Sequence, residues 1–383
     1  MSDEEPMGTA LHPARTMPYA ELLAGLEAAR AAGLVWRRFS AEFGLALYVY
    51  TPRCVYEDGW NVHTLLARGL ILDPAAEQIV ATPFPKFFNL GERLAVLPEL
   101  PFEAFEKLDG SLIIAFFHAG RWRAVTKGAF DSEQAVWARA RLDAAELSAL
   151  VPGTTYLFEA IYPENRIVVR YGDAALVMLA AYDATGCELD YDEVIATCAR
   201  LGWPAAERRA FTSIADMVEH TRGLPKDREG LVIRFADGTR LKLKGDEYRR
   251  IHALISRCTP LAIWEAIAAG DDMAAIRRDL PEEFWDDFDE IVRLLRQQGA
   301  ALEERIASAA AAVADLSDRE LGLTLPGLPA DVRSFLFPYR KAGNRLEGKS
   351  RTVLLRAIRL TGNALPGYAP SYALNRVLDE VVG

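Results

Sequence analysis

Cysteine is scarce in this 383-residue chain, long apolar runs are absent, and positive charge is not in excess. The four cysteines lie 133, 11 and 60 residues apart, which fits neither a zinc ribbon nor a disulfide framework. The longest uncharged apolar run, residues 174–182, has nine residues, about half of what a membrane-spanning helix needs. The acidic N-terminus has no apolar stretch of signal-peptide length. We therefore expect a cytoplasmic protein in a reducing compartment, with no membrane partner.

The charge balance limits how a polyanion could bind. Lysine and arginine number 44 against 54 aspartates and glutamates, so the formal net charge is −10. This excludes a uniformly basic nucleic-acid coat protein, and any polyanion must meet a local basic patch. Apolar residues make up 51% of the chain, which excludes a disordered or fibrous protein. The length is sufficient for roughly two to three domains.

Hydrophobic periodicity divides the chain into three parts. We expect residues 1–44 to form a helical extension that packs on the next domain. Residues 45–250 combine short β-runs, turn residues and a few helical stretches, which predicts an antiparallel-sheet-rich α+β domain. Residues 251–383 have helical periodicity and predict an all-α C-terminal domain, with Pro260 and Pro281 near first turns. The expected strands are 45–50, 70–72, 79–81, 112–117, 123–126, 156–161, 167–169, 176–182, 231–235 and 240–243, and the expected helices are 19–32, 132–150, 191–201, 213–222, 251–278, 281–296 and 300–316.

The most informative segment is residues 105–114, FEKLDGSLII, in which a Lys-x-Asp-Gly-Ser loop leads directly into an apolar strand. A turn with Asp and Gly can present Lys107 from a rigid rim. An unperturbed lysine titrates near 10.4, and burial or nearby cations lower that pKa, which makes an amine nucleophile possible. Taken alone, the pattern also fits an exposed lysine at a hairpin tip.

Charged residues recur downstream in or beside otherwise apolar strands. They are Glu159 in LFEA, Glu229 in REGLV, and Lys242 and Lys244 in LKLK. A charge at such a position is costly unless the strand faces a cleft. The order of these segments after Lys107 therefore favours one functional site over isolated surface charges.

This series resembles the nucleotidyltransferase motifs of ATP-dependent ligases, and in detail those of RNA ligases of the bacteriophage T4 RNA ligase 1 type. The closer likeness rests on Ala67-Arg68-Gly69 before a strand, on PKFFNLGE at residues 85–92, and on NRIVV at residues 165–169. It covers about residues 45–250 and implies an adenylyltransferase domain. It does not extend clearly to the C-terminal third.

The resemblance implies that the amine of Lys107 attacks the α-phosphorus of ATP, releases pyrophosphate and becomes lysyl-AMP. The AMP would then pass to a 5′-phosphate on RNA, and a 3′-hydroxyl would displace it. Lys242 and Lys244 are two residues apart on one strand, so both point to the same face, where they can hold the α-phosphate and lower the pKa of Lys107.

The remaining residues of the implied site serve the nucleotide and the metal. Glu159 would contact a ribose hydroxyl, and Glu229 would hold Mg²⁺ or Mn²⁺ through water. Strand carboxylates that face solvent, a surface lysine at position 127 and a core aromatic at position 88 are the structural alternatives. The further nucleotide-binding residues implied are Arg68, Lys86, Phe88, Glu106, Gly110 and Lys127.

Residues 333–359 hold eight lysines and arginines against one acid, Glu347. The aromatics Phe335, Phe337 and Tyr339 lie among these cations and could stack on bases, which favours an RNA contact. The alternative is a solvated pair of basic helices that balances acidic neighbours.

Residues 343–350, GNRLEGKS, satisfy the P-loop pattern letter for letter. A proline and charges break the preceding segment, and 33 residues follow Ser350, too few for the parallel sheet of a P-loop domain. We therefore interpret the string as a chance match.

The resemblance implies an ATP-dependent RNA ligase that joins 5′-phosphate and 3′-hydroxyl ends in RNA repair, for example of tRNA. Whether a separate end-healing kinase or phosphatase is its partner is left open by the sequence. A DNA ligase or capping-type nucleotidyltransferase is the first alternative. A non-catalytic protein that binds nucleotide or RNA is the second.

Overall fold

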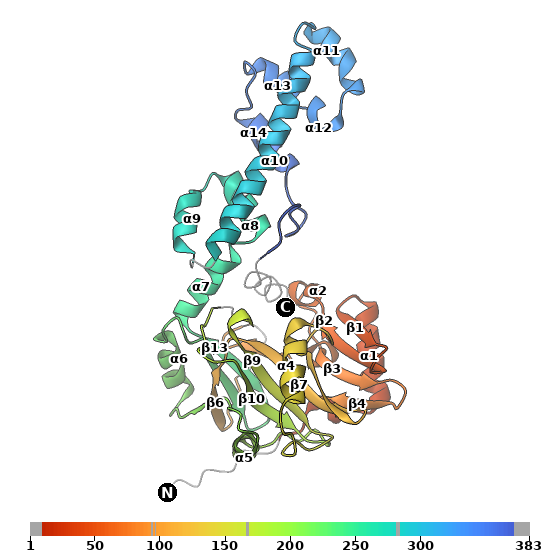
Figure 1. Cartoon of the computed structure of the whole chain (residues 1–383), viewed down its shortest axis with the longest axis vertical. Helices are drawn as coiled ribbons and strands as arrows, with labels where there is room; N and C mark the ends of the chain where they lie inside the picture. Colours follow the sequence, from red (N-terminus) through yellow and green to blue (C-terminus); the bar gives the residue numbers. More distant parts are fainter. Residues whose placement is uncertain (1–9, 93–94, 96, 166–167, 281–283, 371–383) are drawn as a thin grey trace. The chain divides into compact units, whose positions relative to one another are not determined.

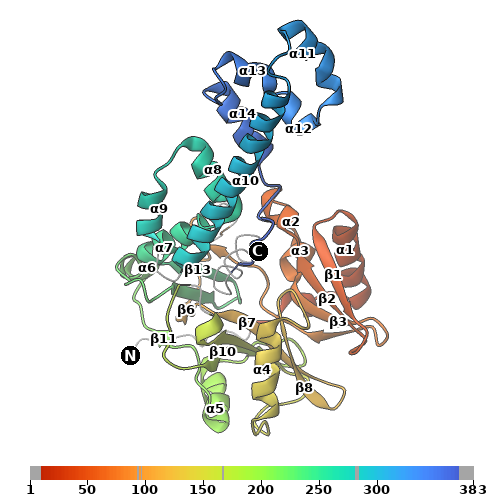
Figure 2. The ribbon, with the colours of Figure 1, turned by 45° about the horizontal axis from the view of Figure 1, so that its top comes forward.

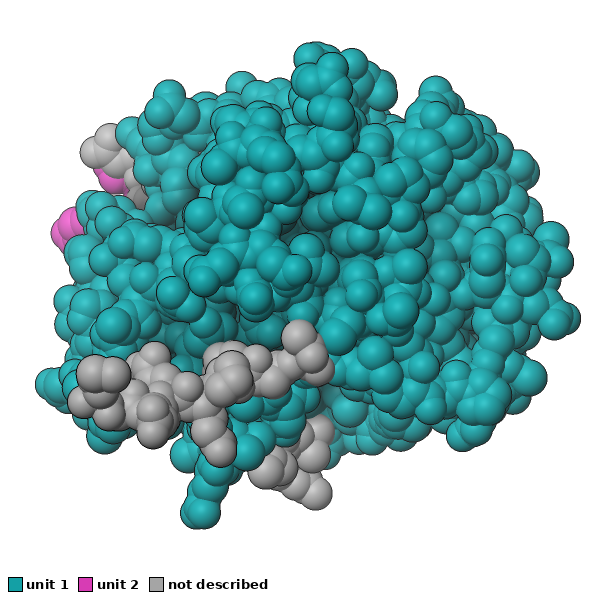
Figure 3. Space-filling view, turned by 90° about the horizontal axis from the view of Figure 1, so that it is seen from below, with its two compact units in different colours: residues 1–252, 379–383 teal, residues 253–378 magenta. Residues whose placement is uncertain are grey.

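The computed structural model describes residues 10–92, 95, 97–165, 168–280 and 284–370. They form two compact units, of which the first ends at His252 and the second begins at Ala253; Figure 3 distinguishes the two by colour.

The first unit begins with a four-stranded antiparallel sheet in the order β1-β2-β3-β4. Leu22 and Leu26 of the N-terminal helix α1 pack on the sheet's inner residues, and Figures 1 and 2 show α1 along its face. The elements are α1 (Tyr19–Ala31), β1 (Val35–Ser40), β2 (Leu45–Tyr50), α2 (Pro52–Tyr56), α3 (Val62–Leu66), β3 (Arg68–Asp73) and β4 (Gln78–Ala81), after a 3-10 turn at Pro13–Arg15.

Strand β1 differs from the expectation that residues 1–44 form only a helical extension. It pairs along the whole of β2, from Val35 opposite Tyr50 to Ser40 opposite Leu45, so the sheet continues across position 44. The strand was missed because it lies at the sheet edge, where four of its six residues are exposed and show no alternation.

A second antiparallel sheet, in the order β10-β9-β7-β8, carries the middle of the unit. One face packs on the first sheet, where Leu47 and Ile71 share a core with Ile114 and Leu157. The other face packs on helices α4 and α5. The elements are β7 (Ser111–His118), β8 (Arg121–Thr126), α4 (Glu133–Asp143), β9 (Thr155–Ile161), β10 (Ala175–Tyr182) and α5 (Tyr191–Leu201).

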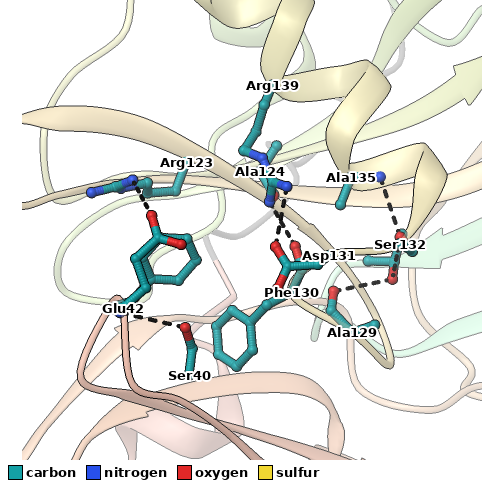
Figure 4. Close-up of polar contacts among 12 residues, drawn as sticks. Ser40, Glu42, Arg123, Ala124, Ala129, Phe130, Asp131, Ser132, Ala135 and Arg139 are labelled. Carbon is teal, nitrogen blue, oxygen red and sulfur yellow. Dashed lines mark hydrogen bonds and ion pairs between the residues drawn. The ribbon is translucent and has the colours of Figure 1, made fainter.

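Arginine side chains fasten this second sheet at its edge (Figure 4). Arg139 of α4 donates to the carbonyl oxygens of Phe130 at 2.6 Å and of Ala124 at 3.3 Å. Arg123 of β8 lies 3.8 Å from the carboxylate of Glu42, in the loop between β1 and β2. These contacts hold α4 and the first sheet against β8.

The third sheet has the order β11-β6-β12-β13-β5, in which β5 runs parallel to β13 and the other neighbours are antiparallel. Met217 of α6 packs against Ile233 and Leu241 of this sheet. The elements are β5 (Phe88–Asn89), β6 (Phe102–Lys107), β11 (Arg208–Arg209), α6 (Ile214–Arg222), β12 (Gly230–Phe235), β13 (Arg240–Lys244) and, after the sheet, α7 (Asp246–Ser256).

Every described element of the second unit is helical. Its longest, α10, is a single 28-residue helix, where sequence periodicity predicted two shorter ones. Pro260 occupies the first turn of α8, as expected, and the Thr259 hydroxyl caps that helix by accepting from Ala262 N–H. The predicted first turn at Pro281 lies outside the described residues. The elements are α8 (Pro260–Ala269), α9 (Met273–Asp279), α10 (Trp285–Ala312), α11 (Asp318–Thr324), α12 (Ala330–Arg333), α13 (Leu336–Lys341) and α14 (Lys349–Ala357).

The predicted fold class, an antiparallel-sheet-rich α+β domain followed by helices, is confirmed. Three further local predictions were wrong. Residues 251–278, expected to form one helix, belong to α7, α8 and α9, with breaks at residues 257–259 and 270–272. Helix 132–150 ends at Asp143, where Ala144 forms its C-cap. Val168 and Val169 lie in irregular backbone, because their N–H groups donate to the carboxylate of Asp109. Ile167 of that predicted strand, like Arg166, lies outside the described residues. Among the described helices, none is long and apolar enough to cross a membrane.

Candidate active site

Three neighbouring strands bring Lys107, Glu229 and Lys244 together. Gly230 of β12 lies opposite Lys107 of β6 on one side and opposite Lys244 of β13 on the other. The carboxylate of Glu229, one residue earlier, is therefore flanked by both amines. Its Oε2 lies 2.7 Å from Lys107 Nζ and its Oε1 lies 3.0 Å from Lys244 Nζ, and the Glu229 side chain is only 3% exposed.

A glycine is required after Glu229. Gly230 has φ +150°, and a Cβ at this position would lie 1.9 Å from the carbonyl oxygen of Leu243. Any side chain would push β13 away and separate Lys244 from Glu229.

Lys242 is the amine whose titration the site changes most clearly. It lies opposite Val232 of β12 and beside Asn89 of β5. Burial, together with the charges of Lys86, Lys107, Lys244 and Arg68, lowers the pKa of Lys242 to about 7. Lys107 is thus one of the cations that act on Lys242, while its own amine is paired with Glu229.

Lys86 sits among three aromatic rings. Its Nζ lies 5.3 Å from the ring centroids of Tyr50 and Trp60 and 5.5 Å from that of Phe88. Burial lowers the pKa of Lys86. Phe88 is therefore part of a cation-binding group of rings beside β13, and not a residue of the apolar core.

Arg68 and Lys127 complete the basic group around Tyr50. A Cβ on Gly69, whose φ is +94°, would lie 2.9 Å from Lys127 Cα, so the glycine allows the strand carrying Arg68 to approach Lys127 closely. Burial lowers the pKa of Arg68. Burial raises the pKa of Tyr50, but the charges of Lys127, Lys86 and Arg68 outweigh this, and the net shift is downward.

Gly110 and Glu159 meet where β7 pairs with β9. A Cβ on Gly110 would lie 2.5 Å from Ala160 O and 2.9 Å from Glu159 Cγ. Gly110 thus lets the Lys107 loop lie directly against the strand that carries Glu159.

The side chain of Glu106, which was predicted to bind the nucleotide, does not lie beside the other predicted residues. It pairs with Arg228 and lies 3.9 Å from Arg209, at the partly exposed border of the third sheet. Successive strand residues point to opposite faces, so Glu106 faces away from the amine of Lys107.

Sequence reasoning missed several residues of the site. Asp109 is 2% exposed, and its Oδ2 accepts hydrogen bonds from Val168 N and Val169 N at 2.7 Å each. Its Oδ1 accepts from the hydroxyl of Tyr248 at 2.9 Å. The Asp-Gly pair was interpreted as a turn, and its pairing with a residue 139 positions away leaves no local signal.

The donor set fits a hydrated divalent cation. The described residues contain no group of three or more His, Cys, Asp or Glu side chains that could hold a metal ion by themselves. Glu229 supplies one buried carboxylate between two lysines. Mg²⁺ usually binds through one or two carboxylates, several waters and the substrate phosphates, and these residues suit that mode.

The basic segment of the second unit, residues 333–359, has seven exposed cations, but its aromatics do not all face solvent. Phe335 is buried in a core with Leu302 and Ile306, so its predicted role in base stacking is wrong. Arg340 donates to the carbonyl oxygens of Val313 at 2.6 Å and Leu316 at 2.8 Å and supports the end of α10. The exposed cations are Arg333, Lys341, Arg345, Lys349, Arg351, Arg356 and Arg359.

The P-loop-like string at residues 343–350 follows helix α13, whereas a P-loop follows a strand. The Ser350 hydroxyl donates to Glu347 O at 2.8 Å and accepts from Glu347 N at 3.0 Å. This hydroxyl caps a turn, as the interpretation of a chance match expects.

The part of the chain that carries Lys107, Glu229 and Lys244 is similar to known proteins. Residues 66–248 match a protein-family model described as RNA ligase. A protein of Autographa californica nuclear polyhedrosis virus, provisionally named a bifunctional polynucleotide kinase/RNA ligase, is 28% identical over 242 residues, which cover 55% of this chain and 34% of the viral protein. A provisionally named RNA ligase of Thermovibrio ammonificans is 27% identical over 200 residues, covering 48% of this chain and 52% of the relative.

Among solved structures, an archaeal ATP-dependent RNA ligase aligns with a TM-score of 0.47 at 16% identity, covering 96% of this chain and 99% of that one. The matches to the two curated relatives span about a third to a half of those relatives' length.

Proposed function

We propose that this protein is an ATP-dependent RNA ligase, starting from the membership of residues 66–248 in the RNA ligase family. The observation that carries the proposal is the ion pair of Lys107 with the buried Glu229, within a group of further cations. Burial lowers the pKa values of the neighbouring Lys242, Lys86 and Arg68, and a bound anion would favour their charged forms, which supports an anion-binding site here.

In the first step, Lys107 Nζ releases its proton to solvent, its lone pair forms a bond to the α-phosphorus of ATP, and the bond from that phosphorus to the pyrophosphate oxygen breaks. The product is a lysyl-AMP phosphoramidate. The phosphorus is then attacked by an oxygen of an RNA 5′-phosphate, which returns the amine. A 3′-hydroxyl finally attacks the activated 5′-phosphate and expels AMP.

The cations have the role of stabilising the negative charge of the phosphates. Lys242, whose pKa is lowered to about 7, gains full charge when a triphosphate binds beside it. Lys244 acts on the same face of β13. Arg68 lies at the start of β3, Lys86 in the segment between β4 and β5, and Lys127 directly after β8. Glu159 contacts the ribose, with Gly110 beside it. Glu229 would hold Mg²⁺ or Mn²⁺ through water, and a divalent ion bound there would offset phosphate charge.

The RNA substrate has 5′-phosphate and 3′-hydroxyl ends, and repair of broken RNA such as tRNA suits this chemistry. A kinase or phosphatase must prepare such ends, and the name of the viral relative combines a kinase with a ligase. The seven exposed cations of residues 333–359 provide the RNA contact in the second unit.

The experiment is incubation with ATP labelled at the α-phosphate and Mg²⁺ or Mn²⁺, followed by intact-mass analysis. We expect an AMP-sized addition that pyrophosphate removes and that Lys107→Ala abolishes. Lys226→Ala, which removes an exposed lysine of the same unit, is the matched control and should label like the wild type. No label in the wild type, or full label in Lys107→Ala, would contradict the proposal.

Substrate assays separate the alternatives. Joining of single-stranded 5′-phosphate RNA supports an RNA ligase. Sealing of nicked DNA alone would favour a DNA ligase, and binding of ATP without pyrophosphate release would favour a non-catalytic protein.

A further inference from the structure

The carboxylate of Asp109 joins segments that are far apart in the sequence to the loop of Lys107. Its two oxygens accept from the N–H groups of Val168 and Val169 and from the hydroxyl of Tyr248. The N–H of Asp109 itself donates to the hydroxyl of Tyr171 at 2.7 Å. Two tyrosine hydroxyls therefore fix the residue two positions after the proposed nucleophile.

Tyr248 also contacts the opposite side of the site. Its ring is 1% exposed, and Lys244 Nζ lies 5.0 Å from the ring centroid. Lys244 pairs with Glu229, and Glu229 pairs with Lys107. These contacts form a continuous chain that runs from Lys107 through Glu229, Lys244 and Tyr248 to Asp109. Because Asp109 lies two residues after Lys107, the chain of contacts returns to the loop where it began.

We propose that the hydroxyl of Tyr248 positions the Lys107 loop for attack on the α-phosphorus, through its hydrogen bond to Asp109. This inference rests on the proposed function. Tyr248 does not touch the reacting atoms, so it is a positioning residue. A small misplacement of a nucleophile lowers the rate of bond formation while substrate binding is largely kept.

The test is Tyr248→Phe, which removes the hydroxyl and keeps the ring beneath Lys244. We expect the single-turnover rate of lysyl-AMP formation at saturating ATP to fall at least about tenfold, since a hydrogen bond to a carboxylate is lost. The KM for ATP should stay within about twofold. Sealing of pre-adenylylated RNA without ATP, which does not use the Lys107 amine as nucleophile, should keep its wild-type rate.

Tyr48→Phe is the matched control. The buried Tyr48 also donates its hydroxyl to a carboxylate at 2.9 Å, that of Glu27, on the helix side of the first sheet. We expect it to leave both rates unchanged. Tyr171→Phe, which removes the acceptor of the Asp109 N–H, should show the same split between the two reactions as Tyr248→Phe.

Three outcomes overturn the inference. They are wild-type adenylylation in Tyr248→Phe, equal losses of adenylylation and of sealing in that variant, and failure of it to fold when Tyr48→Phe folds; the last two mean that the hydroxyl supports the fold as a whole. Absence of lysyl-AMP in the wild type would instead refute the proposed function.

Discussion

Lys242 offers a prediction in which stability and nucleotide binding change in opposite directions. The pKa of this lysine falls from 10.5 to about 7 on folding, because the amine is buried beside other cations. Replacement by methionine keeps the length of the side chain and removes the charge. We therefore expect Lys242→Met to stabilise the first unit and to weaken ATP binding.

The magnitude follows from proton linkage. Each pKa unit corresponds to about 1.4 kcal/mol, so a shift of this size makes folding less favourable by about 4 kcal/mol near pH 7. The native protein binds fewer protons than the unfolded chain between the folded and the unfolded pKa values, so wild-type stability rises with pH in this window. The advantage of Lys242→Met should therefore be largest at or below pH 7 and fall to about 1 kcal/mol or less at pH 10.

The assay is urea unfolding of both proteins at several pH values from 6.5 to 10, followed by tryptophan fluorescence. Lys226→Met is the control, because it removes an exposed lysine, and its stability difference from the wild type should not vary with pH. A difference between Lys242→Met and wild type that stays below about 0.5 kcal/mol, or that does not change with pH, would refute the reasoning.

Three other variants test the active site and the basic segment of the second unit. Glu229→Gln leaves the amines of Lys107 and Lys244 without their carboxylate. We expect the unfolding free energy to fall by about 2–4 kcal/mol and no lysyl-AMP to form. The control is Glu57→Gln, at an exposed ion pair with Arg53, which should leave the urea midpoint unchanged. Gly110→Ala should lower the unfolding free energy of the first unit by about 1–3 kcal/mol and slow adenylylation, because the new Cβ meets Ala160 O and Glu159. Gly128→Ala is the control, since its Cβ enters open space and should change neither quantity. Equal effects of the two variants would contradict the packing argument. The double variant Lys349→Glu with Arg356→Glu should weaken RNA binding, lower the slope of log affinity against log salt concentration by about 1.4, and leave adenylylation unchanged. The charge-matched control is Arg278→Glu with Arg319→Glu. An equal loss of RNA binding in the control would show a nonspecific effect of charge.

Much of the site could be predicted because its signals are local. Alternation along a strand places Lys242 and Lys244 on one face whatever the partner strands are. The strands expected at residues 45–50 and 176–182 and the helix at 191–201 agree with the structure, since their apolar patterns are continuous. The loop of Lys107 was recognised from the residue types and their order.

What could not be predicted depends on register and on distant partners. The placement of Glu229 between two lysines requires that Gly230 face both β6 and β13, and no local pattern encodes that register. The rings around Lys86 come from β2, from the segment before α3 and from β5. The burial of Phe335 depends on its packing against α10.

Residue types, their spacing and the family resemblance that they carry were thus enough to predict the proposed chemistry, because nucleophile, carboxylate and cation are properties of side chains and strand alternation is a property of the backbone. Which amines Glu229 pairs with, which lysines have a lowered pKa and which tyrosines contact Asp109 were decided only by the folded chain. These outcomes depend on distances of a few ångströms and on burial, and both arise when strands far apart in the sequence pair and exclude water.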